Sequence, residues 1–371
     1  MDTNYTPREK NNGSSSRFWI ITGVLFFGAL FFFGAQYKEN NQVATYERKQ
    51  EKVKVPPKPV FDAVAYDKKM ARMANNMVLS VSTSTGASTY VLATSTENYL
   101  WPVKAVYPNV GAILPFHRVI AYYGNLYSTK MGVLGEYPED EMLARLDIEM
   151  AKWNKADPKT PAMPALHYIV ATAQGSAGKE GKYILRMPDS QIDEVLRIAK
   201  KRDAIVFLDL QVALSNLQKE LPYIEKYLKM PQVHLGIDPE FSMKSGAKPG
   251  TEVGTYDATD INYAANYLAK LVKENNLPPK ILVVHRYTQA MVTNYKAIKP
   301  LPEVQIVMHM DGWGPAPKKR NTYERFIYGE PVQFTGFKIF YKNDIWDPGT
   351  KLMTPEDILK LKPQPVYIQY Q

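Results

Sequence analysis

The stretch VHLGIDPEF, residues 233–241, decides the fold class, because an apolar run ends in it at two carboxylates, Asp238 and Glu240. A short apolar run that stops at polar side chains is typical of a strand buried on both faces, as in a parallel sheet. Pro239 cannot donate a hydrogen bond to a sheet ladder, so we expect the strand to end there. Residues i and i+2 of a strand face the same side, which predicts that Asp238 and Glu240 point together.

Seven further apolar runs of the same character lie on either side of this one, separated by helix-like segments. They are RVIAYYG (118–124), PALHYIVAT (164–172), AIVFLDLQ (204–211), KILVVHR (280–286), VQIVMHMD (304–311), GFKIFY (336–341) and PVYIQYQ (365–371). Eight strand–helix alternations within residues 113–371 match a (β/α)8 TIM barrel, whose usual length is about 250 residues. An open doubly wound sheet would accept the same alternation, but no G-x-G-x-x-G or Walker loop follows any run.

Helix signals between the runs agree with a barrel. DSQIDEVLRIAKKRD predicts Ser190 as N-cap with Asp193 three residues later, and TPEDILKLK predicts Thr354 as N-cap. Because the last run reaches Gln371, we expect no eighth helix after it, which would leave the outer face of that strand uncovered. We expect residues 61–77, FDAVAYDKKMARMANNM, to form an amphipathic helix that packs there as a substitute.

The N-terminal part predicts a membrane anchor. FWIITGVLFFGALFFFGAQY, residues 18–37, is 20 residues without a charge, enough for a helix that crosses a hydrocarbon core of about 30 Å. Arg8, Lys10 and Arg17 precede it, so the positive-inside rule places residues 1–17 in the cytoplasm. No A-x-A cleavage site follows, which favours a signal anchor over a cleaved signal peptide. We therefore expect a single-pass cell-membrane protein with its barrel domain outside the cytoplasm.

Residues 38–112 are expected to form an extracytoplasmic tether ahead of a barrel domain at 113–371. The first part of the tether is polar and ends in VKVPPKP, which proline stiffens. SVSTSTGASTYVLATSTEN, residues 80–98, fits a disordered segment, a glycosylated segment or an irregular strand pair, and its composition does not choose among them.

The composition excludes several classes of site and partner. The 371 residues include no cysteine, which removes disulfides, cysteine-ligated zinc and thiol nucleophiles. The net charge of +9 comes from lysines scattered through helix-like segments, as on a solvated surface. No nucleic-acid-binding motif accompanies this charge, so we expect no nucleic-acid partner.

Polar side chains gather where the predicted strands end, which is where barrel proteins place their sites. The expected catalytic residues are Glu240, Asp238 and Asp311. The expected substrate-binding residues are Asp209, His285, Arg286, Tyr287, His309, Trp313, Tyr122, Tyr123, Asn125, Tyr341 and Gln369. Like charges as close as Asp238 and Glu240 favour one protonated member, which a general acid needs near neutral pH. The aromatic members suit stacking on the apolar faces of sugar rings.

The ending GIDPE resembles the D-x-E that closes the fourth strand in glycoside hydrolase families 18 and 25, barrels that act on N-acetylhexosamine polymers. VMHMD is similar to the M-x-Y-D of family 18, with Met310 in place of the tyrosine. The resemblance implies that Glu240 is the general acid and that Asp238 orients the substrate acetamido group, which attacks in place of an enzyme nucleophile. It also implies that Asp311 helps to hold that group or tunes Asp238. Only the end of family 18's longer D-x-x-D-x-D-x-E run is present.

The expected function is that of a membrane-anchored glycoside hydrolase-like protein, which acts by acid catalysis and without a cofactor on N-acetylhexosamine glycans of the cell envelope or the environment. One alternative is a barrel that binds a glycan or a protein without cleaving it. Another is a metal-dependent hydrolase with a mixed nitrogen and oxygen site. Its ligands would come from Asp209, Asp238, Glu240, His285, His309 and Asp311, although no H-x-H or H-E-x-x-H spacing is present. His167 and His234 are expected to be structural.

Overall fold

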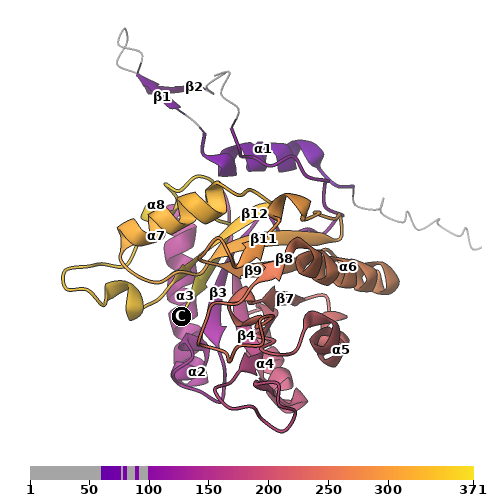
Figure 1. Ribbon diagram of the computed structural model, residues 1–371. Coiled ribbons are helices and arrows are strands. Elements are labelled where there is room, and N and C mark those ends of the chain that lie inside the picture. The colour runs from indigo at the N-terminus through magenta and orange to yellow at the C-terminus, as the bar shows by residue number, and fades with distance from the viewer. Residues whose placement is uncertain (1–59, 77, 82–87, 92–98) are drawn as a thin grey trace, which may run out of the picture. The chain divides into compact units, whose positions relative to one another are not determined.

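The computed structural model describes residues 60–76, 78–81, 88–91 and 99–371. Within them, eight parallel strands close into a barrel in which β13 pairs with β3, so the expected (β/α)8 barrel is confirmed (Figure 1). The strands are β3 (Arg118–Gly124), β4 (Ala162–Ala173), β6 (Ile205–Leu210), β7 (Val233–Ile237), β9 (Lys280–Arg286), β11 (Val304–Met310), β12 (Phe334–Ile339) and β13 (Tyr367–Tyr370). Each of them overlaps one of the predicted runs.

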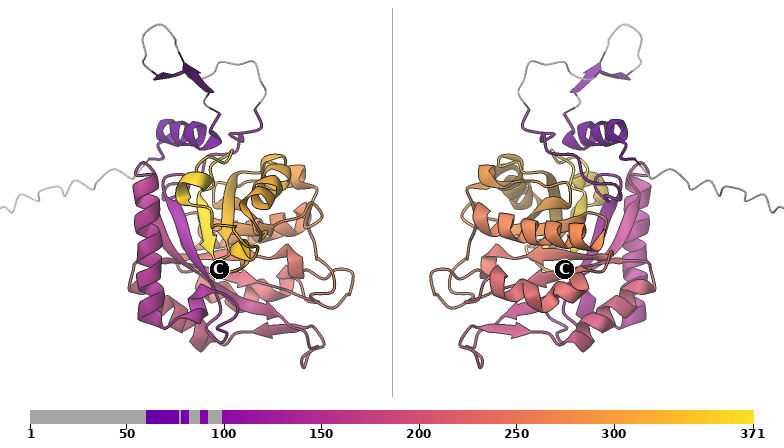
Figure 2. Two further views of the ribbon diagram at one scale, coloured as in Figure 1. Left: turned by 90° about the vertical axis from the view of Figure 1, so that its left-hand side faces the viewer. Right: turned by 90° about the vertical axis from the view of Figure 1, so that its right-hand side faces the viewer.

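The helices lie around the outside of these strands, as both views of Figure 2 show. They are α2 (Val133–Glu136), α3 (Glu139–Ala156), α4 (Asp189–Lys200), α5 (Leu217–Leu228), α6 (Ala258–Asn275), α7 (Ala316–Tyr323) with the π-helical turn η3 (Glu324–Tyr328), and α8 (Pro355–Ile358). Short elements complete the loops, namely β5 (Ile184–Arg186), β8 (Tyr256–Asp257), β10 (Val292–Thr293), η1 (Pro239–Phe241), η2 (Tyr295–Ala297) and η4 (Asn343–Ile345).

The predicted helix caps have different outcomes. Thr354 caps α8 in a capping box with Asp357, as expected. The prediction for Ser190 is wrong, because α4 already begins at Asp189 after Pro188 and has no side-chain cap. Proline fixes an extended approach to the helix, and the acidic Asp189 in the first turn favours the helix dipole without a cap.

The predicted helix within 61–77 is present as α1 (Ala63–Ala74), but its expected packing beside the last strand is wrong. Tyr66, Met70 and Met73 lie on one face of α1 and join an apolar cluster with inward residues of the strands, such as Val119 and Phe207. Since Met73 O accepts a hydrogen bond from the backbone N–H ahead of β13, α1 lies across the end of the barrel where the strands begin (Figure 1). It closes that end and buries the lowest layer of interior side chains.

The outer face of β13 is covered by α3 instead. Trp153 of α3 is buried and its indole Nε1 donates to Tyr370 Oη at 2.9 Å. The same helix packs against β3 and β4 and reaches α8. One long helix therefore spans the seam where the barrel closes, which removes the need for a substitute helix.

Several sequence-based expectations concern residues 1–59, which lie outside the described part of the chain, so the predicted anchor at 18–37 is not tested. Among the described residues, no helix has the length and apolar character needed to span a membrane. The strand β1 (Val78–Val81) overlaps the start of the Ser/Thr-rich region and pairs antiparallel with β2 (Ser88–Val91) within it, which matches the strand-pair alternative.

Candidate active site

A cavity of about 690 Å³ opens at the end of the barrel where the strands finish. Every one of the eight strands contributes to its wall, at its last residues or in the loop that follows. The lining includes Tyr123, Thr172, Gln211, Asp238, Glu240, Phe241, Tyr287, Asp311, Trp313, Lys318, Lys319, Lys338, Phe340 and Gln371. Of the fourteen residues expected at the site, the structure brings six together here: Glu240, Asp238, Asp311, Tyr287, Trp313 and Tyr123.

Asp238 and Glu240 share the cavity, but not through the strand geometry that the sequence suggested. β7 ends at Ile237, and Asp238 caps the 3-10 turn η1, with Oδ1 accepting the Glu240 backbone N–H at 3.1 Å. Asp238 is thereby buried at 2% exposure, while Glu240 is only partly buried. The physical reason is that Pro239 favours the first position of a helical turn and Asp readily caps one. Glu240 is the more accessible of the two acids.

Asp311 lies in the same wall and is held by two cationic or protonated partners. Lys338 Nζ of β12 lies 2.8 Å from Asp311 Oδ1, and His285 Nδ1 of β9 lies 2.7 Å from Asp311 Oδ2. Asp311 follows β11, which lies between β9 and β12 in the sheet. Side chains from three neighbouring strands therefore hold this carboxylate in place. The Nζ atom of Lys338 also lies 4.0 Å from the centre of the Tyr123 ring.

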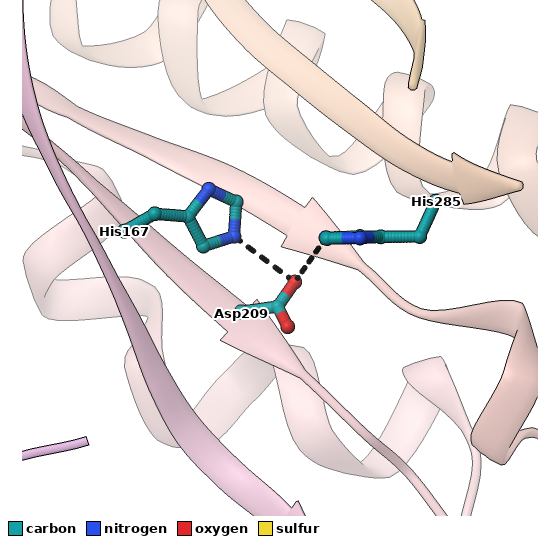
Figure 3. Close-up of side chains that lie close together, drawn as sticks. All are labelled: His167, Asp209 and His285. Carbon is teal, nitrogen blue, oxygen red and sulfur yellow. Dashed lines mark ion pairs between the residues drawn. The ribbon is translucent and has the colours of Figure 1, made fainter. Parts of the chain in front are cut away.

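A second polar cluster lies deeper in the barrel, where Figure 3 shows His167 and His285 each pointing a ring nitrogen at one carboxylate oxygen of Asp209. The distances from Asp209 Oδ1 are 3.2 Å to His167 Nε2 and 3.4 Å to His285 Nε2. All three side chains have 0% exposure. Tyr123 Oη lies 3.3 Å from Asp209 Oδ2 and separates this cluster from the cavity above.

Two groups of side chains in this region have ligand atoms close enough to hold a metal ion. One is His167, Asp209 and His285, and the other is His285, His309 and Asp311; within each group the candidate atoms lie within 4.8 Å of one another. His285 belongs to both groups and links the buried cluster to the cavity wall.

The carboxyl groups of the site differ in their electrostatics. Burial raises the pKa of Asp238 well above its usual range, and the charges of Glu240 and Asp209 add to this effect. Burial and the nearby charge of Asp311 raise the pKa of Glu240, while a hydrogen bond from Tyr287 opposes the rise. Burial also acts on Asp311, but the charges of Lys338 and His285 outweigh it and hold its pKa well below the usual range. The cavity thus contains carboxyl groups whose pKa values are shifted in opposite directions.

The pKa values of the three histidines in this region are also shifted in opposite directions. Burial lowers the pKa of His285, but the charges of Asp209 and Asp311 overcome this and raise it to about 10. Burial lowers the pKa of His167 to about 4. Burial also places the pKa of His309 well below the usual range, with the charge of His285 adding to this.

Eight expected site residues lie outside the cavity lining. Asp209, His285, His309 and Gln369 are buried beneath it, each with 0% exposure. Arg286 donates to backbone carbonyls such as that of Phe326 and pairs with Glu330, so it anchors loops. Tyr122 and Tyr341 meet each other, with their hydroxyl oxygens 3.3 Å apart, and pack against Tyr370. Asn125 shapes its own loop by accepting the Tyr127 N–H and donating to Ile169 O.

The structure also brings to this region residues that the sequence did not assign to the site, chiefly Lys338, Lys319, Gln211 and Phe241 of the cavity wall. It adds His167, which was expected to be structural and contacts Asp209 in the buried cluster. A signal for two of them was present. Lys338 and His167 are the polar residues inside the apolar runs GFKIFY and PALHYIVAT. A lysine or histidine in a strand buried on both faces needs a partner, which points to the barrel interior.

Comparison with known proteins finds no matching family model and no matching curated protein. Solved structures with a similar barrel include the cellulase Cel5C_n, at 14% identity and a TM-score of 0.34, over 60% of this chain and 65% of that chain. An endocellulase from Pyrococcus horikoshii is 13% identical, with a TM-score of 0.38, over 80% of this chain and 88% of that one. A glycerophosphoryl diester phosphodiesterase from Parabacteroides distasonis is 12% identical, with a TM-score of 0.30, over 68% and 82%.

The identities and TM-scores of these likenesses are low, and the activities named for the three proteins differ. The chain spans less than two thirds of the cellulase Cel5C_n. They do not support membership of glycoside hydrolase families 18 or 25. By its own closed ring of eight parallel strands, the described part of this chain is a (β/α)8 barrel with a polar cavity at the carboxyl ends of its strands.

Proposed function

We propose that this chain is a glycoside hydrolase whose general acid is Glu240. The observation that carries the proposal is that Glu240 lines the same cavity as the ion-paired carboxylate of Asp311. A glycosidase needs one carboxyl group to protonate the leaving oxygen and a negative group to offset the positive charge that develops on the sugar ring. In this cavity, Glu240 would be the proton donor and Asp311 would be the negative group.

The environment of Glu240 supports the acid role. The residue is partly buried, and both its burial and the negative charge of Asp311 favour its neutral form. The Tyr287 hydroxyl interacts with the Glu240 carboxyl and orients it. A carboxyl group that keeps its proton near neutral pH can deliver it as the glycosidic bond breaks.

The surroundings favour a reaction in which the substrate supplies the nucleophile. Of the other carboxyl groups that line the cavity, Asp311 is ion-paired with Lys338, and burial favours the neutral form of Asp238, so neither is a ready nucleophile. An N-acetylhexosamine carries an acetamido group whose carbonyl oxygen can bond to the anomeric carbon as the glycosidic bond breaks and Glu240 protonates the leaving oxygen. The Asp311 carboxylate would stabilise the resulting oxazolinium cation. Water then opens it and returns a proton to Glu240.

The cavity also has the size and lining of a sugar site. Its volume of about 690 Å³ lies within the range of about 300–1,000 Å³ found for ligand sites. Trp313 is 50% exposed at its edge, and Phe241 and Tyr287 add aromatic surface. Aromatic faces bind the C–H side of sugar rings, while the charged groups select among polar substituents.

The proposed location follows from the sequence. The uncharged segment 18–37 with basic residues before it supports a signal anchor with the barrel outside the cytoplasm. The substrate would then be a polysaccharide of the cell envelope or of the surroundings. Protease treatment of intact cells tests this: the barrel should be degraded, and a barrel that is protected until the cells are broken would place it in the cytoplasm.

The enzymatic test compares the full-length wild type with Glu240→Gln on a panel of N-acetylhexosamine polymers that includes peptidoglycan, by measuring released reducing ends. Glu240→Gln should lower turnover by about 100-fold or more, because general acid catalysis contributes about 10²–10⁴-fold. The matched control is Glu252→Gln, an exposed residue of the same loop that does not line the cavity, which should keep the wild-type rate.

Two results would count against the proposal. Wild-type turnover in Glu240→Gln would show that another group is the acid. Saturable binding of a glycan without any product would support the alternative of a non-catalytic glycan-binding barrel.

A further inference from the structure

We propose that His167 Nε2, Asp209 Oδ1 and His285 Nε2 bind one divalent transition-metal ion, with Zn²⁺ as the best fit, inside the barrel beneath Tyr123. This inference goes beyond the proposed hydrolase activity and does not depend on it. The three side chains come from β4, β6 and β9 and converge in the barrel interior (Figure 3).

The spacing of the three atoms fits ligands around an ion better than hydrogen-bond partners. Asp209 Oδ1 lies 3.2 Å from His167 Nε2 and 3.4 Å from His285 Nε2, and within the described part of the chain none of these three buried atoms makes a hydrogen bond of good geometry. An N–H···O hydrogen bond is usually about 2.9 Å long. Tetrahedral zinc, with bonds of about 2.0–2.1 Å, leaves its ligand atoms about 3.3 Å apart.

The outer nitrogen of each imidazole is already engaged, as in protein metal sites. His167 Nδ1 lies 2.6 Å from Tyr367 Oη, and His285 Nδ1 lies 2.7 Å from Asp311 Oδ2. Metal-bound histidines usually donate their second N–H to a carboxylate or another oxygen, which fixes the tautomer and the ring orientation. Here both contacts leave the Nε2 atom of each ring turned toward the same place, Asp209 Oδ1.

The backbone beside the three side chains has no side chain of its own, because residue 236 is glycine. A Cβ at Gly236 would lie 2.3 Å from Asp209 Oδ1 and 2.5 Å from His167 Nε2. These separations are far shorter than any non-bonded contact, so any side chain at residue 236 would displace two of the three proposed ligands.

The overlapping group of His285, His309 and Asp311 is less suited to an ion. Asp311 Oδ2 already contacts His285 Nδ1, and Asp311 Oδ1 pairs with Lys338 Nζ at 2.8 Å. An ion there would compete with the lysine ammonium for the same carboxylate. Among the described residues, no lysine or arginine pairs with Asp209, so an ion there would replace only protons of the two histidines.

The test uses the untagged full-length chain, dialysed against Zn²⁺ and then against metal-free buffer, with metal content measured by mass spectrometry. We expect one Zn²⁺ per chain, and X-ray absorption at the zinc edge should show two imidazole nitrogens and a carboxylate oxygen as ligands. Asp209→Asn should lose the ion. Tyr367→Phe, which keeps the ring and removes one outer contact, should weaken binding about 10-fold or more.

The matched control is His117→Gln, because His117 is partly buried before β3 and lies outside the proposed site; it should bind Zn²⁺ like the wild type. A wild-type chain that stays free of zinc, with the same melting temperature in Zn²⁺ and in chelator, would overturn the proposal. So would equal zinc content in wild type and Asp209→Asn, or an absorption spectrum without imidazole ligands. These outcomes do not depend on the folding of any single variant or on activity.

Discussion

Lys338 Nζ lies 2.8 Å from Asp311 Oδ1, and both side chains are almost completely buried, at 3% and 8% exposure. Lys338 lies in β12, and Asp311 directly follows the adjacent strand β11. The ion pair therefore links two neighbouring strands at the cavity wall. The pair sets the charge that Glu240 senses, because Asp311 raises the pKa of Glu240 and Lys338 opposes that rise.

The first prediction concerns the stability of this pair. Lys338→Met should lower the free energy of unfolding by about 3 kcal/mol, since it removes one of the two partners that compensate the buried Asp311 carboxylate. The double variant Lys338→Met with Asp311→Asn should recover part of this loss, because neither charge then remains. Denaturant unfolding of the wild type, both single variants and the double variant gives the coupling energy.

Lys318→Met is the control, because Lys318 also lines the cavity but is exposed. It should change the free energy of unfolding by less than about 0.5 kcal/mol. If the effects of the two single variants at 338 and 311 simply add, the two side chains do not interact energetically. The ion pair then does not stabilise the cavity wall.

The second prediction concerns the pH dependence of the proposed activity. Glu240 must be protonated to act as an acid, so kcat/KM should fall as pH rises through its pKa. The Tyr287 hydroxyl stabilises the ionised form by hydrogen bonding and lowers the pKa of Glu240. Tyr287→Phe should therefore move the alkaline limb of the profile to higher pH. A limb that moves to lower pH, or stays in place, contradicts this arrangement of acid and tyrosine.

The third prediction tests the role of α1 as a cover for the lower end of the barrel. Met70→Ala should lower the free energy of unfolding by about 2–5 kcal/mol, because Met70 is 7% exposed within the apolar cluster. Val64→Ala on the same helix is the control, because Val64 is 80% exposed and should cost less than about 0.5 kcal/mol. Equal effects of the two substitutions would show that α1 does not close the barrel.

The barrel could be predicted because its strands are continuous apolar runs bounded by helix signals. β3 and β9 coincide with the predicted runs 118–124 and 280–286. The position of α1 could not be predicted in the same way. Its apolar face, with Tyr66 and Met70, is visible in the sequence, but the surface that this face covers depends on the tertiary fold.

The site was predictable only in part, for two physical reasons. A search of strand ends finds Glu240 and Asp311, but it misses inward side chains one step earlier, such as Lys338, which reach the cavity from within the strand. The geometry of Asp238 also depends on local chemistry, because its carboxylate caps a turn and does not continue the strand. The pattern Asp-Pro-Glu is also typical of a capping aspartate followed by a helical turn, and that alternative predicts different positions for Asp238 and Glu240.

The last prediction concerns the aromatic edge of the cavity. Trp313 is 50% exposed, and Lys318 Nζ lies 4.8 Å from the centre of its ring, which holds the indole at the cavity. Trp313→Ala should raise KM for a glycan about fivefold, the equivalent of about 1 kcal/mol of lost stacking, with little change in kcat. Trp346→Ala is the control, since Trp346 is 75% exposed and does not line the cavity. A fall in kcat at unchanged KM would mean that Trp313 acts on the chemical step, and unchanged kinetics in both variants would place the sugar elsewhere.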